Sequence, residues 1–405
     1  MRILQKGFVA GPLLGALWAL VMAVTVSVAM SFATGEGFRP GLWGSLVMGA
    51  LAGAVLLAPA RKDWLAAGLT LLGALWVLSG VIAPIHRAEG AGLGATVVAG
   101  LIFGAALAFP LARILAGIRP GVLSRHEFEE AVIRFLTGFG YLFFTAIVII
   151  PFYVMVMTSM KSQQQLMLNP LDFTIDLSRG WHLFDSYVQL FEKFNFGRYL
   201  WTSFYVSVLT VALTLLFSVP GAYAVARLRF RGQKLFSRGI LLIYMVPMIV
   251  LALPIYIAYS MVGLRNSILG VVMIYPVTTI PVALYMLQGY FRGLPVEVEE
   301  AGLMDGLSRL KVIWKITLPL ALPALASVGL YVFMIAWNEF LLAFMLLDDP
   351  NKFTLTRGIA SLNSSEIPRQ HLMAGAVIAT VPIMALFLGL ERFMTRGLTA
   401  GAVKG

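Results

Sequence analysis

The chain has no cysteine and only four histidines. Without cysteine there are no disulfides and no thiolate metal sites. His86, His126, His182 and His371 are scattered over predicted loops, which is not the pattern of a metal centre or of a general acid/base pair. The sequence also lacks any G-x-x-x-x-G-K-[ST] stretch, the signature of a phosphate-binding loop. We therefore expect this chain to hold no cofactor and to hydrolyse no nucleotide by itself.

Charge is scarce as well. Of 405 residues, 12% are charged and 60% are hydrophobic, whereas a soluble domain has roughly 25% charged residues. Apolar runs of about twenty residues recur, each long enough to cross about 30 Å of hydrocarbon. This predicts an all-α integral membrane protein with about ten transmembrane helices. The predicted spans are residues 8–31, 41–59, 64–85, 91–115, 139–159, 199–225, 238–259, 267–290, 322–347 and 372–391.

The basic residues predict the topology. If the N-terminus is inside, 20 of the 30 Lys and Arg residues fall in cytoplasmic segments, as the positive-inside rule expects. The net charge of +11 is then loop charge and does not indicate a nucleic-acid partner. The basic loop from Arg227 to Arg238 is interpreted in the same way, as a solvated inside loop rather than an anionic-lipid patch. Both termini are predicted to be cytoplasmic.

Three parts are predicted along the chain. Residues 1–118 form a four-span block rich in Gly, Ala and Leu, in which small residues let helices approach closely. The block carries no motif and is interpreted as a packing or assembly appendage. Residues 119–138 form a polar cytoplasmic connector, and residues 139–405 form a six-span core.

One charged, amphipathic passage lies between two apolar spans of the core, at residues 296–318. Acidic residues follow Pro295, where the positive end of a helix dipole favours them. Asp305-Gly306 predicts a turn, Ser308 is placed to cap a second short helix, and Pro319 and Pro323 are expected to stop it. The pattern alone also fits a helix lying on the lipid surface.

The residues of this passage resemble the EAA loop of ABC importer permeases. In that family the loop is a coupling helix that docks in a cleft of the ATP-binding subunit. Gly302 departs from the family, which usually has Ala there, and glycine costs up to about 1 kcal/mol of helix propensity. The resemblance implies that the coupling residues are Glu300, Ala301, Gly302, Asp305, Gly306, Leu318 and Pro319.

The C-terminal tail, residues 397–405, is similar to the tail of maltose-type sugar permeases. In close relatives this tail reaches the interface of the ATPase subunits, which implies contacts from Gly397, Thr399, Gly401 and Lys404. A frayed terminus also fits its composition. Together with the loop from Pro350 to His371, the tail narrows the resemblance to the second permease subunit of carbohydrate importers.

Trp337, Asn338 and Glu339, which lie in the predicted span 322–347, are candidate residues of the translocation pathway. Glu339 is the only acid of 19 that lies well inside a predicted span, and a carboxylate at that depth usually has a partner or a task. Two roles stay open for Asn338 and Glu339: a structural one, or lining of the translocation pathway. The permease family often has a similar W-N-E/D-F sequence here.

The resemblance implies a type I ABC importer subunit that moves a di- or oligosaccharide such as maltose, maltodextrin or trehalose. The implied partners are a second permease subunit, two copies of an ATP-binding subunit that hold ATP and Mg, and an extracytoplasmic sugar-binding protein. The implied location is a bacterial or archaeal cytoplasmic membrane, with lipid around the chain and no nucleic acid. The alternatives are an ion-coupled secondary transporter of a small solute and, less consistent with the scattered histidines, a membrane enzyme.

Overall fold

A computed structural model describes residues 6–58, 62–87, 92–169, 172–364 and 367–399. The chain divides into two compact units, Met1–Gly180 and Trp181–Gly405. The described residues are almost entirely helical, and their only strands are a short antiparallel pair, β1 (Phe38–Pro40) and β2 (Ile85–Arg87). The 3-10 segment η1 (Leu177–Phe184) contains the boundary, with a non-helical kink at Gly180.

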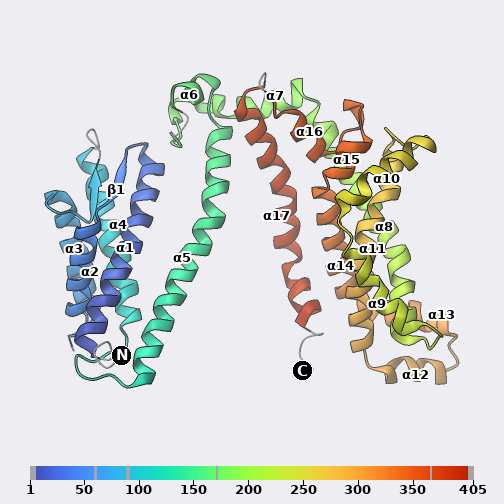
Figure 1. The fold of residues 1–405 in the computed structure, drawn as a ribbon, viewed down its shortest axis with the longest axis horizontal. Coiled ribbons are helices and arrows are strands. Elements are labelled where there is room, and N and C mark those ends of the chain that lie inside the picture. Colours follow the sequence, from blue (N-terminus) through green and yellow to red (C-terminus); the bar gives the residue numbers. More distant parts are fainter. Residues whose placement is uncertain (1–5, 59–61, 88–91, 170–171, 365–366, 400–405) are drawn as a thin grey trace. The chain divides into compact units, whose positions relative to one another are not determined.

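Four apolar helices of the first unit pack side by side (Figure 1). They are α1 (Gly7–Thr34), α2 (Leu42–Val55), α3 (Lys62–Ser79) and α4 (Leu93–Ile114). Glycines let α1 and α2 touch through their backbones: a Cβ at Gly15 would lie 2.1 Å from the Gly49 carbonyl oxygen. Trp18 is buried and its Nε1 donates to the Ala106 carbonyl at 3.1 Å, which ties α1 to α4.

The fifth helix of this unit, α5 (Arg125–Ser159), begins inside the predicted connector. Ser124 and Glu127 form a reciprocal capping box at its start. Arg125 and Glu129, which lie one helical turn apart, form an ion pair that stabilises the first turns. Residues 125–138 of the predicted connector are therefore helix that is continuous with the predicted span 139–159. At the other end the Tyr153 hydroxyl oxygen lies 3.0 Å from the Phe32 carbonyl and 3.1 Å from the Phe173 carbonyl, and its one hydrogen is shared between them. The short helix α6 (Gln163–Leu168) follows.

The second unit contains the remaining helices. Its long helices are α8 (Phe196–Arg227), α11 (Ile268–Gly293), α14 (Leu318–Asn338) and α17 (Arg369–Thr399), and α8 packs against both α11 and α14. The Thr214 and Thr279 hydroxyls join α8 to α11 at 2.6 Å. The shorter elements are α7 (Asp185–Lys193), α9 (Gln233–Tyr244), α10 (Met248–Met261), α12 (Val296–Met304), α13 (Arg309–Val312), η2 (Ile313–Thr317), α15 (Leu341–Leu346), η3 (Pro350–Lys352) and α16 (Leu355–Ser361).

The predicted all-α membrane architecture is confirmed, with corrections to individual spans. Among the described residues, seven helices are long and apolar enough to cross a membrane, and three shorter apolar helices lie at the other predicted spans. The span predicted at 238–259 is broken between α9 and α10, where Pro247 has no N–H to continue the helix. The span predicted at 322–347 is broken at Glu339 and Phe340, between α14 and α15.

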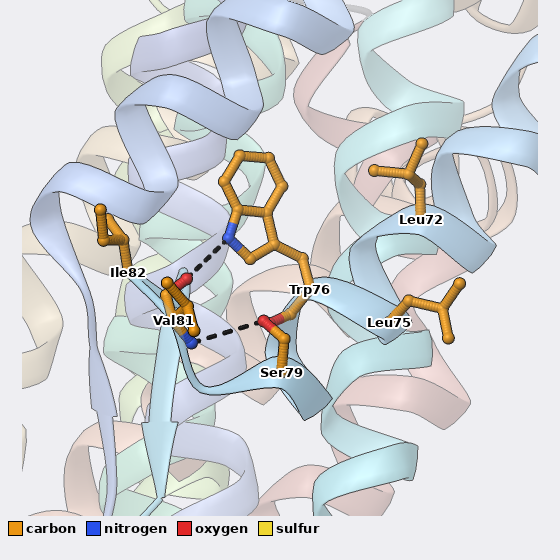
Figure 2. Close-up of a pocket in the computed structure, with 6 residues that line it drawn as sticks. All are labelled: Leu72, Leu75, Trp76, Ser79, Val81 and Ile82. Carbon is orange, nitrogen blue, oxygen red and sulfur yellow. Dashed lines mark hydrogen bonds between the residues drawn. The ribbon is translucent and has the colours of Figure 1, made fainter.

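A shallow pocket of about 480 Å³ opens on the first unit (Figure 2). Its walls are Leu72, Leu75, Trp76, Ser79, Val81 and Ile82. The Trp76 indole N–H already donates to the Val81 carbonyl at 3.0 Å, and the Ser79 hydroxyl accepts from the Val81 N–H. The pocket therefore presents apolar walls whose polar atoms are paired with one another.

Candidate functional site

The predicted helix-turn-helix forms at one end of the second unit, across the bundle from α7 and α16 (Figure 1). Helix α12 runs from Val296 to Met304, and Asp305 follows it as the C-cap residue. Gly306 adopts φ +82°, a left-handed conformation that favours glycine. The Gly306 N–H donates to the Leu303 carbonyl and the Leu307 N–H donates to the Gly302 carbonyl, so the turn satisfies its own backbone.

The second helix of the passage differs from the prediction. Ser308 occupies the N-cap position of α13 but makes no capping hydrogen bond with its side chain. Pro319 and Pro323 do not stop the helix, because α13 continues through the π-helical turn η2 into α14. Pro319 lies in the first turn of α14, directly after the widened turn, where a missing N–H is tolerated. The second part of the passage, α13 and η2, is thus continuous with α14, and α12 is a separate short helix.

Gly302 faces inward, toward the second helix. A Cβ at this position would lie 2.6 Å from Ile316 Cδ1 and 3.4 Å from Val312 Cγ2. The departure from the family's usual Ala therefore coincides with a close approach of α12 to the helix that follows. The atom in the way is the far end of a flexible side chain, so the contact is adjustable.

A buried charge cluster holds α12 in place. The Glu299 carboxylate accepts hydrogen bonds from the Tyr223 hydroxyl at 3.1 Å and from Thr317 Oγ1 at 3.0 Å. Arg227 Nε lies 3.5 Å from Glu299 Oε1, with only 8% of the arginine side chain exposed. Arg227 Nη2 also donates to the Leu294 carbonyl at 2.7 Å, just before α12. We call Tyr223, Arg227, Glu299 and Thr317 the Glu299 cluster.

This cluster joins three elements: the end of α8, the short helix α12, and η2 at the start of α14. A buried ion pair of this kind needs every partner, because removal of one leaves an unpaired buried charge. The sequence analysis missed it, since Glu299 was considered only as a helix-dipole acid and Arg227 only as loop charge. One signal was available: Glu299 lies three residues before Gly302, so both share the inward face of α12.

The other predicted coupling residues face outward. Glu300, Ala301, Asp305, Gly306 and Pro319 are exposed, and Leu318 is half-buried. The same segment exposes large apolar side chains, with Met304 87%, Leu310 70% and Trp314 71% exposed. The helix pair therefore has one face fixed to the bundle and another that combines acids with uncovered apolar groups.

The three candidate pathway residues separate in the structure. Trp337 is buried, stacks on Phe333 with ring centroids 5.6 Å apart, and donates from Nε1 to the Ala379 carbonyl of α17. Asn338 is exposed and donates to the Met334 carbonyl of its own helix. These contacts place Trp337 in the packing of α14 on α17.

Glu339 lies at the break between α14 and α15. Its carboxylate accepts from the Leu342 N–H at 2.8 Å and from the Ala343 N–H at 3.1 Å. These two donors belong to the first turn of α15, where an acid also complements the helix dipole. Its own carbonyl accepts from Thr356 Oγ1 at 2.6 Å. Glu339 thus has the hydrogen-bonded partners expected of a structural carboxylate.

Two of the four residues predicted to make tail contacts lie within the described residues, and the contacts of all four stay a prediction. Gly397 and Thr399 lie in the last turn of α17. Gly401 and Lys404 lie outside the described residues, so their role stays a prediction. Within the described part of the chain, no group of three or more His, Asp or Glu residues is arranged to hold a metal ion.

Comparisons with known proteins show the family of this chain. Residues 218–399 match the family described as binding-protein-dependent transport system inner membrane component. The Escherichia coli inner membrane ABC transporter permease protein YcjP is 36% identical over 66% of this chain and 95% of its own length. The chain belongs to this family of ABC transporter permeases.

Two further relatives extend the comparison of this permease. The trehalose/maltose transport system permease protein MalG of Thermococcus litoralis is 33% identical over 68% of this chain and 99% of its own length. A solved bacterial ABC transporter involved in import of the acidic polysaccharide alginate shares the fold, with a TM-score of 0.56 and 22% identity over 66% of this chain and 98% of that one. About a third of this permease has no counterpart in these relatives, consistent with an additional block before the common core.

Proposed function

We propose that this permease is one of two transmembrane subunits of an ABC importer for a di- or oligosaccharide. Membership of the permease family supports the assignment to the ABC transporters, and the name of the trehalose/maltose relative supports a sugar as the substrate. In this proposal a second permease subunit completes the pathway and a sugar-binding protein outside delivers the substrate. ATP and Mg are bound by two copies of a separate ATP-binding subunit.

One observation supports the coupling role most directly: α12 is anchored on one side and uncovered on the other. The Glu299 cluster ties α12 to the ends of α8 and α14, so a force applied to α12 is transmitted to two spans. The opposite side exposes Met304, Leu310 and Trp314 beside acids and bases. Large apolar groups exposed at the aqueous end of a membrane protein are typical of a partner surface.

The alternative of an ion-coupled transporter receives less support. Such transporters carry ionisable groups at membrane depth that bind and release the coupling ion. Here the Glu339 carboxylate is committed to two backbone N–H groups of α15. Of the described acids at the α12 end, Glu297, Glu300 and Asp305 are exposed, and the buried Glu299 is paired with Arg227.

The test is co-purification with uptake measured in parallel. The full chain is expressed with its neighbouring transporter genes, and the ATPase activity of the purified complex is measured with and without sugar-loaded binding protein. Glu300→Lys reverses a charge on the exposed face, and Gly306→Pro forces φ to about −65°, incompatible with the observed turn. Both variants are expected to insert normally and to abolish uptake.

Glu192→Lys, an equal charge reversal on α7 at the other end of the second unit, serves as the matched control for Glu300→Lys. The coupling proposal is wrong if Glu300→Lys transports as well as this control, or if the purified complex contains no ATP-binding subunit. Crosslinks from position 304 or 314 to lipid alone would favour the interfacial-helix alternative.

A further inference from the structure

Two cavities of opposite character lie between the same two helices, α9 and α11. The first has a volume of about 530 Å³ and polar walls: Gln233, Lys234, Ser237, Arg238 and Arg292. The second has a volume of about 260 Å³ and apolar walls: Phe236, Gly239, Ile240, Ile280, Pro281 and Leu284. Neither cavity contains a residue of the coupling loop or of the break at Glu339.

The polar cavity carries an excess of positive charge. Within the described residues, no carboxylate forms an ion pair with Lys234, Arg238 or Arg292. The Gln288 amide lies 2.6 Å from Ser237 Oγ. With its oxygen turned toward Arg292, it accepts from both guanidinium Nη atoms at 3.0 and 2.7 Å. The Arg292 head is therefore held in position while the cavity keeps three uncompensated cations, a combination suited to an anionic group.

The apolar cavity extends further along α11. On α9 the linings of the two cavities interleave, because Phe236 lies between Lys234 and Arg238, and Gly239 follows Arg238 directly. On α11, Leu284 precedes Arg292 by eight residues, or about 12 Å of helix rise. The headgroup region of one leaflet is roughly 5–8 Å thick. A molecule with its anionic group among the cations therefore has its apolar part at the depth of Leu284. A free phosphate or nucleotide would leave this second cavity without a function.

We propose that these two cavities form a binding site for one anionic phospholipid, with the phosphate among Lys234, Arg238 and Arg292 and an acyl chain against Gly239 and Leu284. The site lies at the same end of the second unit as α12 (Figure 1). It departs from the sequence-based interpretation, which preferred a solvated loop to an anionic-lipid patch, because Lys234 and Arg238 belong to the helix α9. The inference depends on the membrane location of the family and not on the sugar or on ATP coupling.

The test is native mass spectrometry of the delipidated full-length protein, purified with any subunits that remain bound, titrated with phosphatidylglycerol or phosphatidylcholine. We expect tighter binding of one phosphatidylglycerol. Lys234→Gln/Arg238→Gln is expected to weaken it about 30-fold, since each cation near an anionic headgroup contributes roughly fivefold. Arg229→Gln/Arg231→Gln removes the same charge outside the cavity and serves as the matched control.

A second pair of variants tests the apolar half. Gly239→Phe fills the apolar cavity, where a Cβ meets no atom within 4 Å, and is expected to abolish the selective binding. Gly289→Phe, at an equally open position of α11 outside the cavity, should bind like the unmodified protein. If Lys234→Gln/Arg238→Gln and Arg229→Gln/Arg231→Gln weaken phosphatidylglycerol binding equally, the specific site is wrong, and the lipid responds only to the overall positive charge of the surface. Inorganic phosphate or glycerol 3-phosphate that competes fully, with Gly239→Phe unaffected, would overturn the lipid in favour of a soluble anion.

Discussion

Helices α1 to α4 of the first unit and helices α8, α11 and α14 of the second are held together by different contacts. In the first set, glycines bring backbones together and the described buried polar residues are only Ser27, Ser45 and Thr96. In the second set, α8 buries a row of Ser and Thr hydroxyls along its length, and the Glu299 cluster adds an ion pair. Close backbone packing leaves little freedom to slide.

Breaks in the helices follow the same division. The second unit interrupts its spans between α9 and α10 and again between α14 and α15, and it widens a turn at η2. In the first unit, α1 and α4 run through Pro12 and Pro110 without a break. We infer that helices α1 to α4 form a static block and that the spans that move during transport belong to the six-span core. The predictions below test this contrast from the largest effect to the smallest.

The largest effect is expected from Arg227→Met. The variant leaves the buried Glu299 carboxylate without its cation, which should lower the free energy of unfolding by about 3 kcal/mol. Thermal unfolding in detergent measures the loss. Arg229→Met, an exposed arginine two residues further on, is the control, and Glu299→Gln in the Arg227→Met background should recover part of the stability. Equal stability of the two arginine variants would show that the ion pair contributes nothing.

Gly15→Ala should destabilise the contact between α1 and α2 in the first unit. Its methyl group meets the Gly49 carbonyl at 2.1 Å, so α1 and α2 must separate at a cost of about 2 kcal/mol. Gly68→Ala, where a Cβ meets no atom within 4 Å, should be neutral or slightly stabilising because alanine favours helix. Thermal unfolding compares the two. If the folded fraction of Gly15→Ala takes up sugar normally, helices α1 to α4 act as a scaffold. If the folded fraction has a specific transport defect, these helices move during transport.

Glu339→Ala removes the cap of α15 and should cost about 1 kcal/mol. Glu339→Gln keeps an oxygen that can accept one of the two backbone N–H groups, so it should cost less. Uptake and sugar specificity of Glu339→Gln separate the two roles left open by the sequence. Unchanged transport assigns Glu339 to capping alone, whereas altered specificity would place it on the pathway.

The smallest effect concerns the pair of Lys161 and Asp172, which lies after α5 and is joined at 2.8 Å. Partial burial opposes ionisation of Asp172, but hydrogen bonds from Lys161 and Thr174 outweigh it and lower the pKa of the carboxyl. The folded protein therefore favours the charged form. This contribution is complete above the ordinary aspartate pKa of about 3.9 and is lost as the pH falls through the lowered value. Because Asp172 is partly exposed, the contribution should be below about 1 kcal/mol.

Melting temperatures of the unmodified protein and Asp172→Asn at neutral and acidic pH check this prediction. The difference should be present at neutral pH and shrink in acid. A difference that grows on acidification would reverse the sign and exclude the ion pair as its source.

The sequence predicted the membrane class, the position of most spans and the turn at Asp305 and Gly306, because these depend on local properties. Apolar run length decides whether a segment crosses a bilayer, and Asp-Gly favours a turn in almost any context. Motif spacing likewise located the segment from Glu300 to Pro319.

Only the tertiary structure decided which side chains of that segment face inward. Whether Glu299 or Glu300 is buried depends on the side of α12 on which α8 and η2 lie. The contacts that bury Glu299 come from distant parts of the sequence: Arg227 of α8 lies 72 residues before it, and Thr317 of η2 lies 18 residues after it. The sequence could not predict the roles of Pro319 and Glu339 for the same reason. Proline tolerance depends on the preceding turn, and a carboxylate at a helix break depends on which backbone N–H groups the fold brings to it.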